Sequence, residues 1–159
     1  MTSLPPLNLP PARLKIRREG GLIKVYDRLR DKYVNLTPEE YVRQHFVEYL
    51  IGGLHYPATI MANEIAIDLN GTRKRCDTVV FGADGAPLMI VEYKAPGVVV
   101  NQNVFDQIVR YNMRLKAKYL VVSNGLNHFC CINDYAADTY QFIPRIPDYR
   151  DLTIPFSDN

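Results

Sequence analysis

Two acidic residues and a lysine, Asp77, Glu92 and Lys94, have the types and spacing best suited to chemistry in this chain of 159 residues. Glu92 and Lys94 are separated by one residue, so in a β-strand their side chains share a face. Carboxylate oxygens are the ligands that Mg²⁺ prefers. A bound divalent ion lowers the pKa of its water, and a nearby lysine can hold a phosphate or that water. These are the groups that hydrolysis of a phosphodiester bond needs.

The segment between the two acids predicts a β-hairpin that brings them together. If Asp84 and Gly85 form a two-residue turn, the strand register follows by counting outward. The Cβ atoms of Asp77 and Glu92 are then roughly 5 Å apart on opposite strands, although a bulge would shift the pairs. The predicted pairs are Ala83–Ala86, Phe81–Leu88, Val79–Ile90, Asp77–Glu92 and Arg75–Lys94.

This register places the two acids on a face with apolar neighbours. Like charges that face each other cost stability, so something must neutralise them. One possibility is a bound Mg²⁺ or Mn²⁺ ion, and the other is a structural salt-bridge cluster with Lys94 and Arg75. The spacing alone leaves both open. The apolar residues expected on this face are Val79, Phe81, Leu88 and Ile90.

Hydrophobic periodicity and turn residues predict an α/β fold: a central mixed sheet, containing an antiparallel three-strand meander, with a helix on each side. Thr37-Pro38-Glu39-Glu40 is typical of a helix start, and Gly52-Gly53 of a helix end. Asn70-Gly71 predicts a tight turn. The other expected elements are a hairpin over 14–26, strands over 59–69, 72–81 and 88–94, a helix over 103–115, and strands over 119–123, 128–133 and 139–143, the last at the edge.

The domain organisation expected is an extended arm over 1–12 with four prolines, a single domain over 13–149, and a tail over 150–159. Hydrophobic residues make up 47% and charged residues 23%, as in ordinary globular proteins. The chain has no apolar run long enough for a transmembrane helix and no apolar signal core, so we expect a cytoplasmic protein. Its three cysteines are expected to be reduced and buried.

Several polar residues have a structural interpretation beside the functional one. Arg73-Lys74-Arg75 is most simply solvated surface. The same is expected for the helix face formed by Glu40, Gln44 and Glu48, with one of them in the cleft as the lesser alternative. His128 is expected to be structural, and so is His45, although His45 could reach the site.

Taken in order, these motifs resemble the PD-(D/E)XK nucleases, and most closely the N-terminal nuclease domain of the type I restriction enzyme R subunit. The resemblance covers about residues 26–149. It implies a restriction-endonuclease-like core, and its Gln-x-x-x-Tyr helix motif is shared with RecB-type nucleases. The segments that carry it are Leu36–Arg43, Glu64, Arg75-Cys76-Asp77, Val91–Pro96, Gln107–Tyr111 and Ser123–Gly125.

The resemblance implies a role for each matched residue. Asp77 and Glu92, with the carbonyl of Tyr93, would bind Mg²⁺ or Mn²⁺, and Glu64 would join directly or through water. Lys94 would position the nucleophile and stabilise developing charge. Gln107 and Tyr111, at i and i+4, would share a helix face that borders the site. Contacts to DNA phosphates are expected from Arg75, Arg110 and Arg43, the last two of which could instead pair with acids.

The sequence also departs from the family pattern. Cys76 stands where the motif has proline, and no GxxxxGK[ST] motif of a helicase motor occurs. The chain is therefore expected to be either a stand-alone relative or a fragment, which works with DNA and with other restriction subunits or a helicase. Two alternatives remain, an inactive nucleic-acid-binding module of the same fold and an interaction protein with a salt-bridge network. A homodimer stays open.

Overall fold

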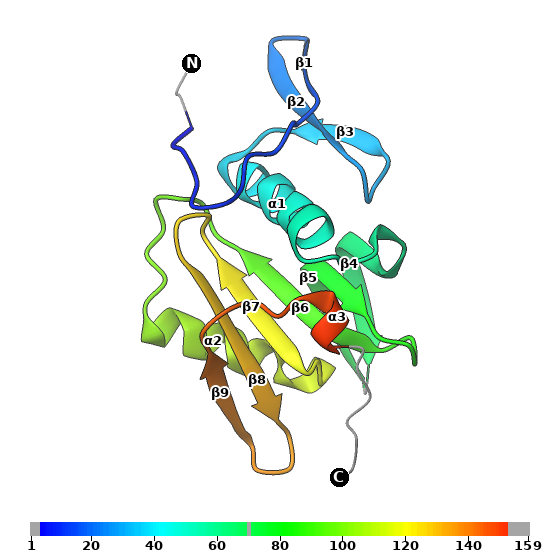
Figure 1. Ribbon diagram of the computed structural model, residues 1–159, viewed down its shortest axis with the longest axis vertical. Helices are drawn as coiled ribbons and strands as arrows, with labels where there is room; N and C mark the ends of the chain where they lie inside the picture. The colour runs from blue at the N-terminus through cyan, green and yellow to red at the C-terminus, as the bar shows by residue number, and fades with distance from the viewer. Residues whose placement is uncertain (1–3, 70, 153–159) are drawn as a thin grey trace.

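A six-stranded mixed sheet forms the centre of the computed structural model, which describes residues 4–69 and 71–152 (Figure 1). The strand order is β4-β5-β6-β7-β8-β9, and only β6 and β7 run parallel. The predicted mixed sheet with an antiparallel meander is confirmed. The strands are β4 (Met61–Leu69), β5 (Thr72–Phe81), β6 (Pro87–Tyr93), β7 (Tyr119–Ser123), β8 (His128–Asp134) and β9 (Thr139–Ile143).

Two helices cover opposite faces of this sheet, as predicted (Figure 1). Helix α1 (Pro38–Glu48) packs on one face and α2 (Gln102–Asn112) on the other, each with its own apolar cluster. Short turns flank them: a π-helical turn Tyr49–Gly53 after α1, and 3₁₀ turns Ala58–Ile60 and Met113–Leu115. The sheet is thus buried on both sides, which explains why every residue of β7 is buried.

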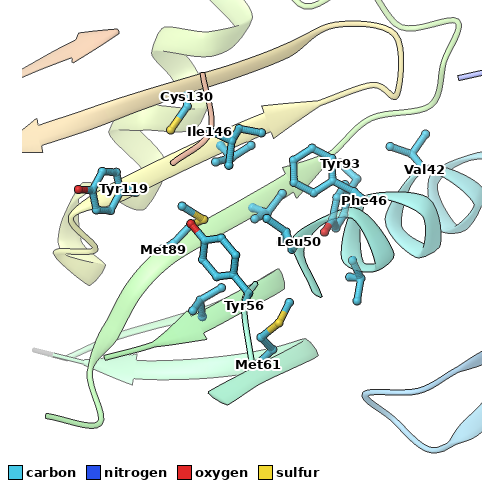
Figure 2. Packing of buried hydrophobic residues seen from close by; sticks show 14 residues of the cluster. Val42, Phe46, Leu50, Tyr56, Met61, Met89, Tyr93, Tyr119, Cys130 and Ile146 are labelled. Carbon is cyan, nitrogen blue, oxygen red and sulfur yellow. The ribbon is translucent and has the colours of Figure 1, made fainter. Parts of the chain in front are cut away.

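The start of α1 follows from its sequence. The Thr37 side chain accepts a hydrogen bond of 3.1 Å from the Glu40 backbone N–H, and Pro38 occupies the first helical position. Val42, Phe46 and Leu50 then face the sheet and pack against Met89 and Tyr93 of β6 (Figure 2). This packing fixes α1 over the strand that carries Glu92.

A second, three-stranded sheet lies beside α1 (Figure 1). Its strands are β1 (Ile16–Glu19), β2 (Leu22–Asp27) and β3 (Lys32–Asn35). The sequence predicted only the first two. The third was missed because the turn before it has no glycine or proline: the Asp27 side chain accepts from the backbone N–H groups of Leu29 and Arg30, and Asp31 takes φ +51°.

The predicted β5–β6 register holds away from the turn and fails beside it. Val79 faces Ile90 as expected, but Phe81 faces Pro87, so the predicted pair with Leu88 is wrong. The turn is longer than two residues, because the Gly82 backbone N–H donates to the Ala86 carbonyl, 2.8 Å away. The resulting bulge moves Leu88 to the α1 side, while Phe81 stays on the α2 side.

The ends of the chain pack against this body. In the predicted arm, the Asn8 backbone N–H donates to the Gly125 carbonyl at 2.8 Å. The predicted tail begins within a short helix, α3 (Tyr149–Leu152). Residues 1–3 and 153–159, and Asn70 of the predicted Asn70-Gly71 turn, lie outside the described residues. No helix in the described part of the chain is long and apolar enough to cross a membrane.

Candidate active site

An open pocket of about 430 Å³ lies between α2 and strands β5 and β6. Four of the five residues predicted to be catalytic line it: Glu92, Lys94, Gln107 and Tyr111. Two come from the end of β6 and the residue after it, and two from successive turns of α2, which explains how distant motifs meet. The complete lining is Lys74, Arg75, Glu92, Lys94, Gln107, Ile108, Tyr111 and Asn112.

Asp77, the fifth residue, does not line the pocket but lies next to it in the sheet. Thr78 pairs with Val91, which puts Asp77 beside Glu92 in the register. The Asp77 carboxylate accepts a hydrogen bond of 2.9 Å from the Tyr93 backbone N–H. Burial raises the pKa of Asp77 above its ordinary value of 3.8, the Tyr93 amide lowers it, and the nearby Glu92 charge raises it. The charges of Asp77 and Glu92 therefore interact unfavourably when both carboxylates are ionised.

The strand alternation changes phase at Asp77, so part of the predicted shared face is wrong. Cys76 and Val79 are three residues apart and yet both pack in the cluster under α2. Opposite Asp77, Glu64 has φ +52°, and the bridge pairs on either side leave these two residues out. The Asp77 carbonyl is instead bound by Arg43. Such irregularities are common where a strand redirects a functional side chain.

Glu64 is held between two arginines. Arg43 Nη2 and Arg75 Nε donate to its two carboxylate oxygens at 2.6 and 2.8 Å. Burial acts to raise the pKa of Glu64, but the hydrogen bonds from Arg75 and Arg43 outweigh it and hold the pKa below 4.5. A metal ion at Glu64 would have to share the carboxylate with these two guanidinium groups.

Arg43 is buried and paired with acids, which was the alternative to the predicted contact with DNA phosphates. Its side chain is 7% exposed. Nη1 donates to the Asp77 carbonyl and Nη2 to Glu64, both at 2.6 Å. Nε lies 3.0 Å from Glu40 Oε2 without the angle of a hydrogen bond. Arg110 is exposed on α2 and lines a different pocket, with Asp106 and Tyr140.

Lys74 belongs to the site and was missed from the sequence. Its Nζ lies 2.5 Å from Glu92 Oε1, and its side chain is only 4% exposed. The expectation that Arg73-Lys74-Arg75 is solvated surface is therefore wrong for Lys74. The signal was present: Lys74 is two residues from Cys76 and faces Ile67, so alternation puts it on the inward face.

A buried polar network connects the small sheet to Tyr93 of β6 through β4 and β5, and Gln44 of α1 also joins it. Asp27 Oδ2 accepts from Arg30, Gln44 and Asn63, and Asn63 accepts from Thr78, which accepts from the Tyr93 hydroxyl. Arg30 also pairs with Glu40 at 2.6 Å. Glu40 and Gln44 are buried, so the expected solvated face of α1 is wrong for both.

His45 of α1 and His128 of β8 each have a partner within the fold. His128 Nδ1 lies 2.7 Å from Ser123 Oγ and Nε2 lies 2.8 Å from the Asn8 carbonyl, which confirms the structural expectation. His45 Nδ1 lies 2.9 Å from the Tyr41 carbonyl one turn earlier in α1. The cysteines Cys76, Cys130 and Cys131 are free and buried, and burial raises the pKa of the Cys76 thiol to about 11.

The donor set fits Mg²⁺ better than a softer metal. Asp77, Glu92 and the Tyr93 carbonyl supply only oxygen atoms, and Mg²⁺ is commonly bound by one or two carboxylates, waters and substrate phosphates. Among the described residues, no group of three or more His, Cys, Asp or Glu side chains is placed to hold a metal. A metal site here would therefore use two carboxylates, and the Tyr93 backbone carbonyl, water and substrate would complete the coordination.

The six-stranded sheet covered by one helix on each face is the mixed α/β core that the sequence predicted. The family model for the type I restriction enzyme R protein N terminus (HSDR_N) matches residues 38–147, and the chain belongs to this family. The match includes α1, the six-stranded sheet and α2, and thus every residue of the candidate site.

A solved structure supports the fold. It is described as a fragment of an HsdR subunit of a type I restriction enzyme from Vibrio vulnificus YJ016, and it is 20% identical, with a TM-score of 0.50. The alignment covers 74% of this chain and 25% of that one, so the chain spans about a quarter of that relative's length. Comparison with the curated proteins gives no match.

Proposed function

We propose that this chain is a divalent-metal-dependent DNA endonuclease domain of the type I restriction R family, which hydrolyses phosphodiester bonds. The observation that carries the proposal is the pocket in which Glu92, Lys94, Gln107 and Tyr111 meet beside Asp77. In the cell it would act in the cytoplasm on DNA, alongside other restriction subunits or a helicase.

The charge of the pocket supports a polyanionic substrate. Its lining includes three cationic side chains, Lys74, Arg75 and Lys94, and one acid, Glu92. A cleft of this sign attracts phosphates and raises their local concentration. Because DNA affinity depends largely on such contacts, we expect binding to weaken steeply with salt.

The residues divide the chemistry between them. Asp77, Glu92 and the Tyr93 carbonyl would hold the metal, which when bound lowers the pKa of a water and offsets charge on the phosphate. The Tyr93 N–H keeps the Asp77 carboxylate in place beside Glu92. Lys94 positions the attacking water and stabilises the negative charge that develops on the phosphate. Its own backbone is fixed, because its N–H donates to the Ser123 carbonyl at 2.9 Å.

Gln107 and Tyr111 form the opposite wall of the pocket. They lie at i and i+4 on α2, and both are exposed. An amide and a phenol can donate to phosphate oxygens without adding charge. We assign them to orienting the DNA backbone against Lys94.

The test is cleavage of supercoiled plasmid DNA by the purified chain with Mg²⁺ or Mn²⁺. Asp77→Asn and Lys94→Met should each lower the cleavage rate by about a hundredfold or more, because each removes a group used in the transition state. Matched controls are Asp68→Asn and Lys116→Met, which change the same charges at exposed positions. These controls should cleave as the wild type does.

Three results would contradict the proposal in different ways. Cleavage that survives Asp77→Asn would place the chemistry elsewhere. DNA binding with no cleavage by any preparation would favour a binding module of the same fold. Absence of both DNA binding and metal uptake would leave an interaction domain in which the acids serve a salt-bridge network.

A further inference from the structure

Lys74 is a buried cation on the face of β5 that points toward α2. Its Nζ lies 2.5 Å from Glu92 Oε1, 3.4 Å from the Arg75 carbonyl and 4.6 Å from the centre of the Tyr111 ring. Its neighbours Ile67 and Cys76 belong to the apolar cluster under α2. Burying an ion pair costs free energy, and a pair of well-packed apolar side chains of similar size often stabilises a fold at least as well. A lysine here therefore calls for a use of its charge.

We propose that Lys74 is a substrate-binding residue of the pocket, which a divalent cation bound by Glu92 releases to contact a DNA phosphate. The inference rests on the proposed metal-dependent function and adds a residue and an order of events to it. Lys74 then neutralises the Glu92 charge in the metal-free site, and it neutralises a DNA phosphate when the metal and the substrate are bound.

Competition for Glu92 follows from charge and distance. Lys74 Nζ lies beside Oε1, one of the two Glu92 oxygens that a bound cation could use. A divalent ion carries twice the charge of the ammonium group and repels it at this separation, most strongly in a half-buried place. The ammonium group is the partner that can move, because its four-carbon stem is flexible while its Cα stays in β5.

The lining of the pocket holds uncharged acceptors, such as the Arg75 carbonyl 3.4 Å from Lys74 Nζ, but no second charged partner for the released ammonium group. Among the eight residues that line it, Glu92 is the only acid, so a cation displaced from Glu92 finds no second carboxylate there. A phosphate oxygen in the pocket would satisfy it, and the Tyr111 ring would keep it near by a cation–π contact. Lys74 would then bind substrate from the β5 side, while Lys94 acts from the end of β6.

Mn²⁺ affinity, measured by calorimetry on the full chain without DNA, tests the competition. Lys74→Met should raise the affinity roughly tenfold, because the competing cation is gone. A residue that merely held Glu92 in place would give the opposite sign. Arg73→Met is the matched control, since it removes one positive charge at the adjacent exposed position. It should change the affinity much less.

Reductive methylation of the wild-type chain, read by mass spectrometry, gives a second measurement that needs no variant. Mn²⁺ should make Lys74 more reactive, and a short phosphorothioate duplex added with Mn²⁺ should protect it again. The exposed Lys116 is the reference. Should Lys74→Met fail to fold, this measurement decides alone.

The inference is overturned if Lys74→Met binds Mn²⁺ no more tightly than Arg73→Met does, or if saturating Mn²⁺ leaves Lys74 protected. It is also overturned if the duplex gives no protection. A wild-type chain that binds no Mn²⁺ at all would instead overturn the proposed metal-dependent function, and this inference with it.

Discussion

Arg43 Nη1 donates a hydrogen bond of 2.6 Å to the backbone carbonyl oxygen of Asp77. The same guanidinium group binds Glu64 and lies beside Glu40, so one buried side chain of α1 joins the helix to β4 and β5. The Asp77 carboxylate meanwhile accepts from the Tyr93 N–H. Arg43 thus fixes the backbone at the residue proposed to hold the metal.

Replacing Arg43 by methionine should be strongly destabilising, because Glu40 and Glu64 lose a buried partner. Removing one member of a buried ion pair costs about 3–5 kcal/mol. Urea denaturation measures the change. The matched control is Arg28→Met, which breaks an exposed pair with Glu48 and should cost less than about 1 kcal/mol. Equal losses in the two variants would contradict the role given to Arg43.

Local sequence was sufficient to predict the six-stranded sheet, the helix on each of its faces and the meeting of Glu92, Lys94, Gln107 and Tyr111 in one pocket. The Thr37 cap, the Val79–Ile90 register and the i, i+4 spacing of Gln107 and Tyr111 depend on near neighbours, and the structure has all three. The Phe81–Leu88 pair failed because turn length is decided by backbone geometry that Asp84-Gly85 does not specify alone.

Long-range pairing accounts for what the sequence could not predict. The buried Asp27 carboxylate accepts hydrogen bonds from Gln44 of α1 and Asn63 of β4. The residues near Asp27 in the sequence do not predict either partner. The burial of Lys74, unlike that of Asp27, could be predicted from local sequence, because strand alternation places its side chain inward. It was missed because the two flanking arginines made the whole run resemble a solvated surface. Charge runs should therefore be interpreted strand face by strand face.

Asp27 should make the fold sensitive to acid. Burial alone would raise its pKa, but hydrogen bonds from Asn63 and Arg30 more than offset this, so the folded pKa lies below the ordinary 3.8. The stability from this group is therefore present above about pH 4 and is lost as the pH falls through the folded pKa. Denaturation at a series of pH values below 5 should show this loss.

The variant Asp27→Asn isolates this contribution. It should be less stable than the wild type at pH 7 by about 2–4 kcal/mol, since Arg30 loses one of its two charged partners and keeps only Glu40. Its stability should also fall less between pH 5 and pH 2. An acid profile parallel to that of the wild type would assign the loss to other carboxylates.

Gly125 should resist substitution for two reasons that can be separated. Its φ is +86°, which strains any side chain, and an added Cβ would lie 2.7 Å from Leu7 Cδ2 and 3.2 Å from Val42 Cγ2. Gly21 has φ +80° with nothing within 4 Å of such a Cβ. Gly21→Ala should therefore cost about 1 kcal/mol from the backbone alone.

Gly125→Ala should cost more than Gly21→Ala, because the N-terminal arm must also move. Thermal unfolding compares the two, and limited proteolysis should cut near Leu7 faster in Gly125→Ala only. If the two variants lose the same stability, the arm yields to the new methyl group without cost, and its packing on Gly125 contributes little.

Gln107 and Tyr111 should matter for DNA and not for stability. Both are exposed, Tyr111 to 67%, so Gln107→Ala and Tyr111→Ala should each change the free energy of unfolding by less than about 1 kcal/mol. Because both line the pocket, each should weaken duplex binding, and the loss should be similar for different DNA sequences, as expected of contacts to the backbone. Electrophoretic mobility shift at low salt measures this.

Asn103→Ala, exposed on the same helix and absent from the pocket lining, is the control and should bind as the wild type does. Equal binding by all three variants and the wild type would mean that this wall of the pocket does not meet the DNA.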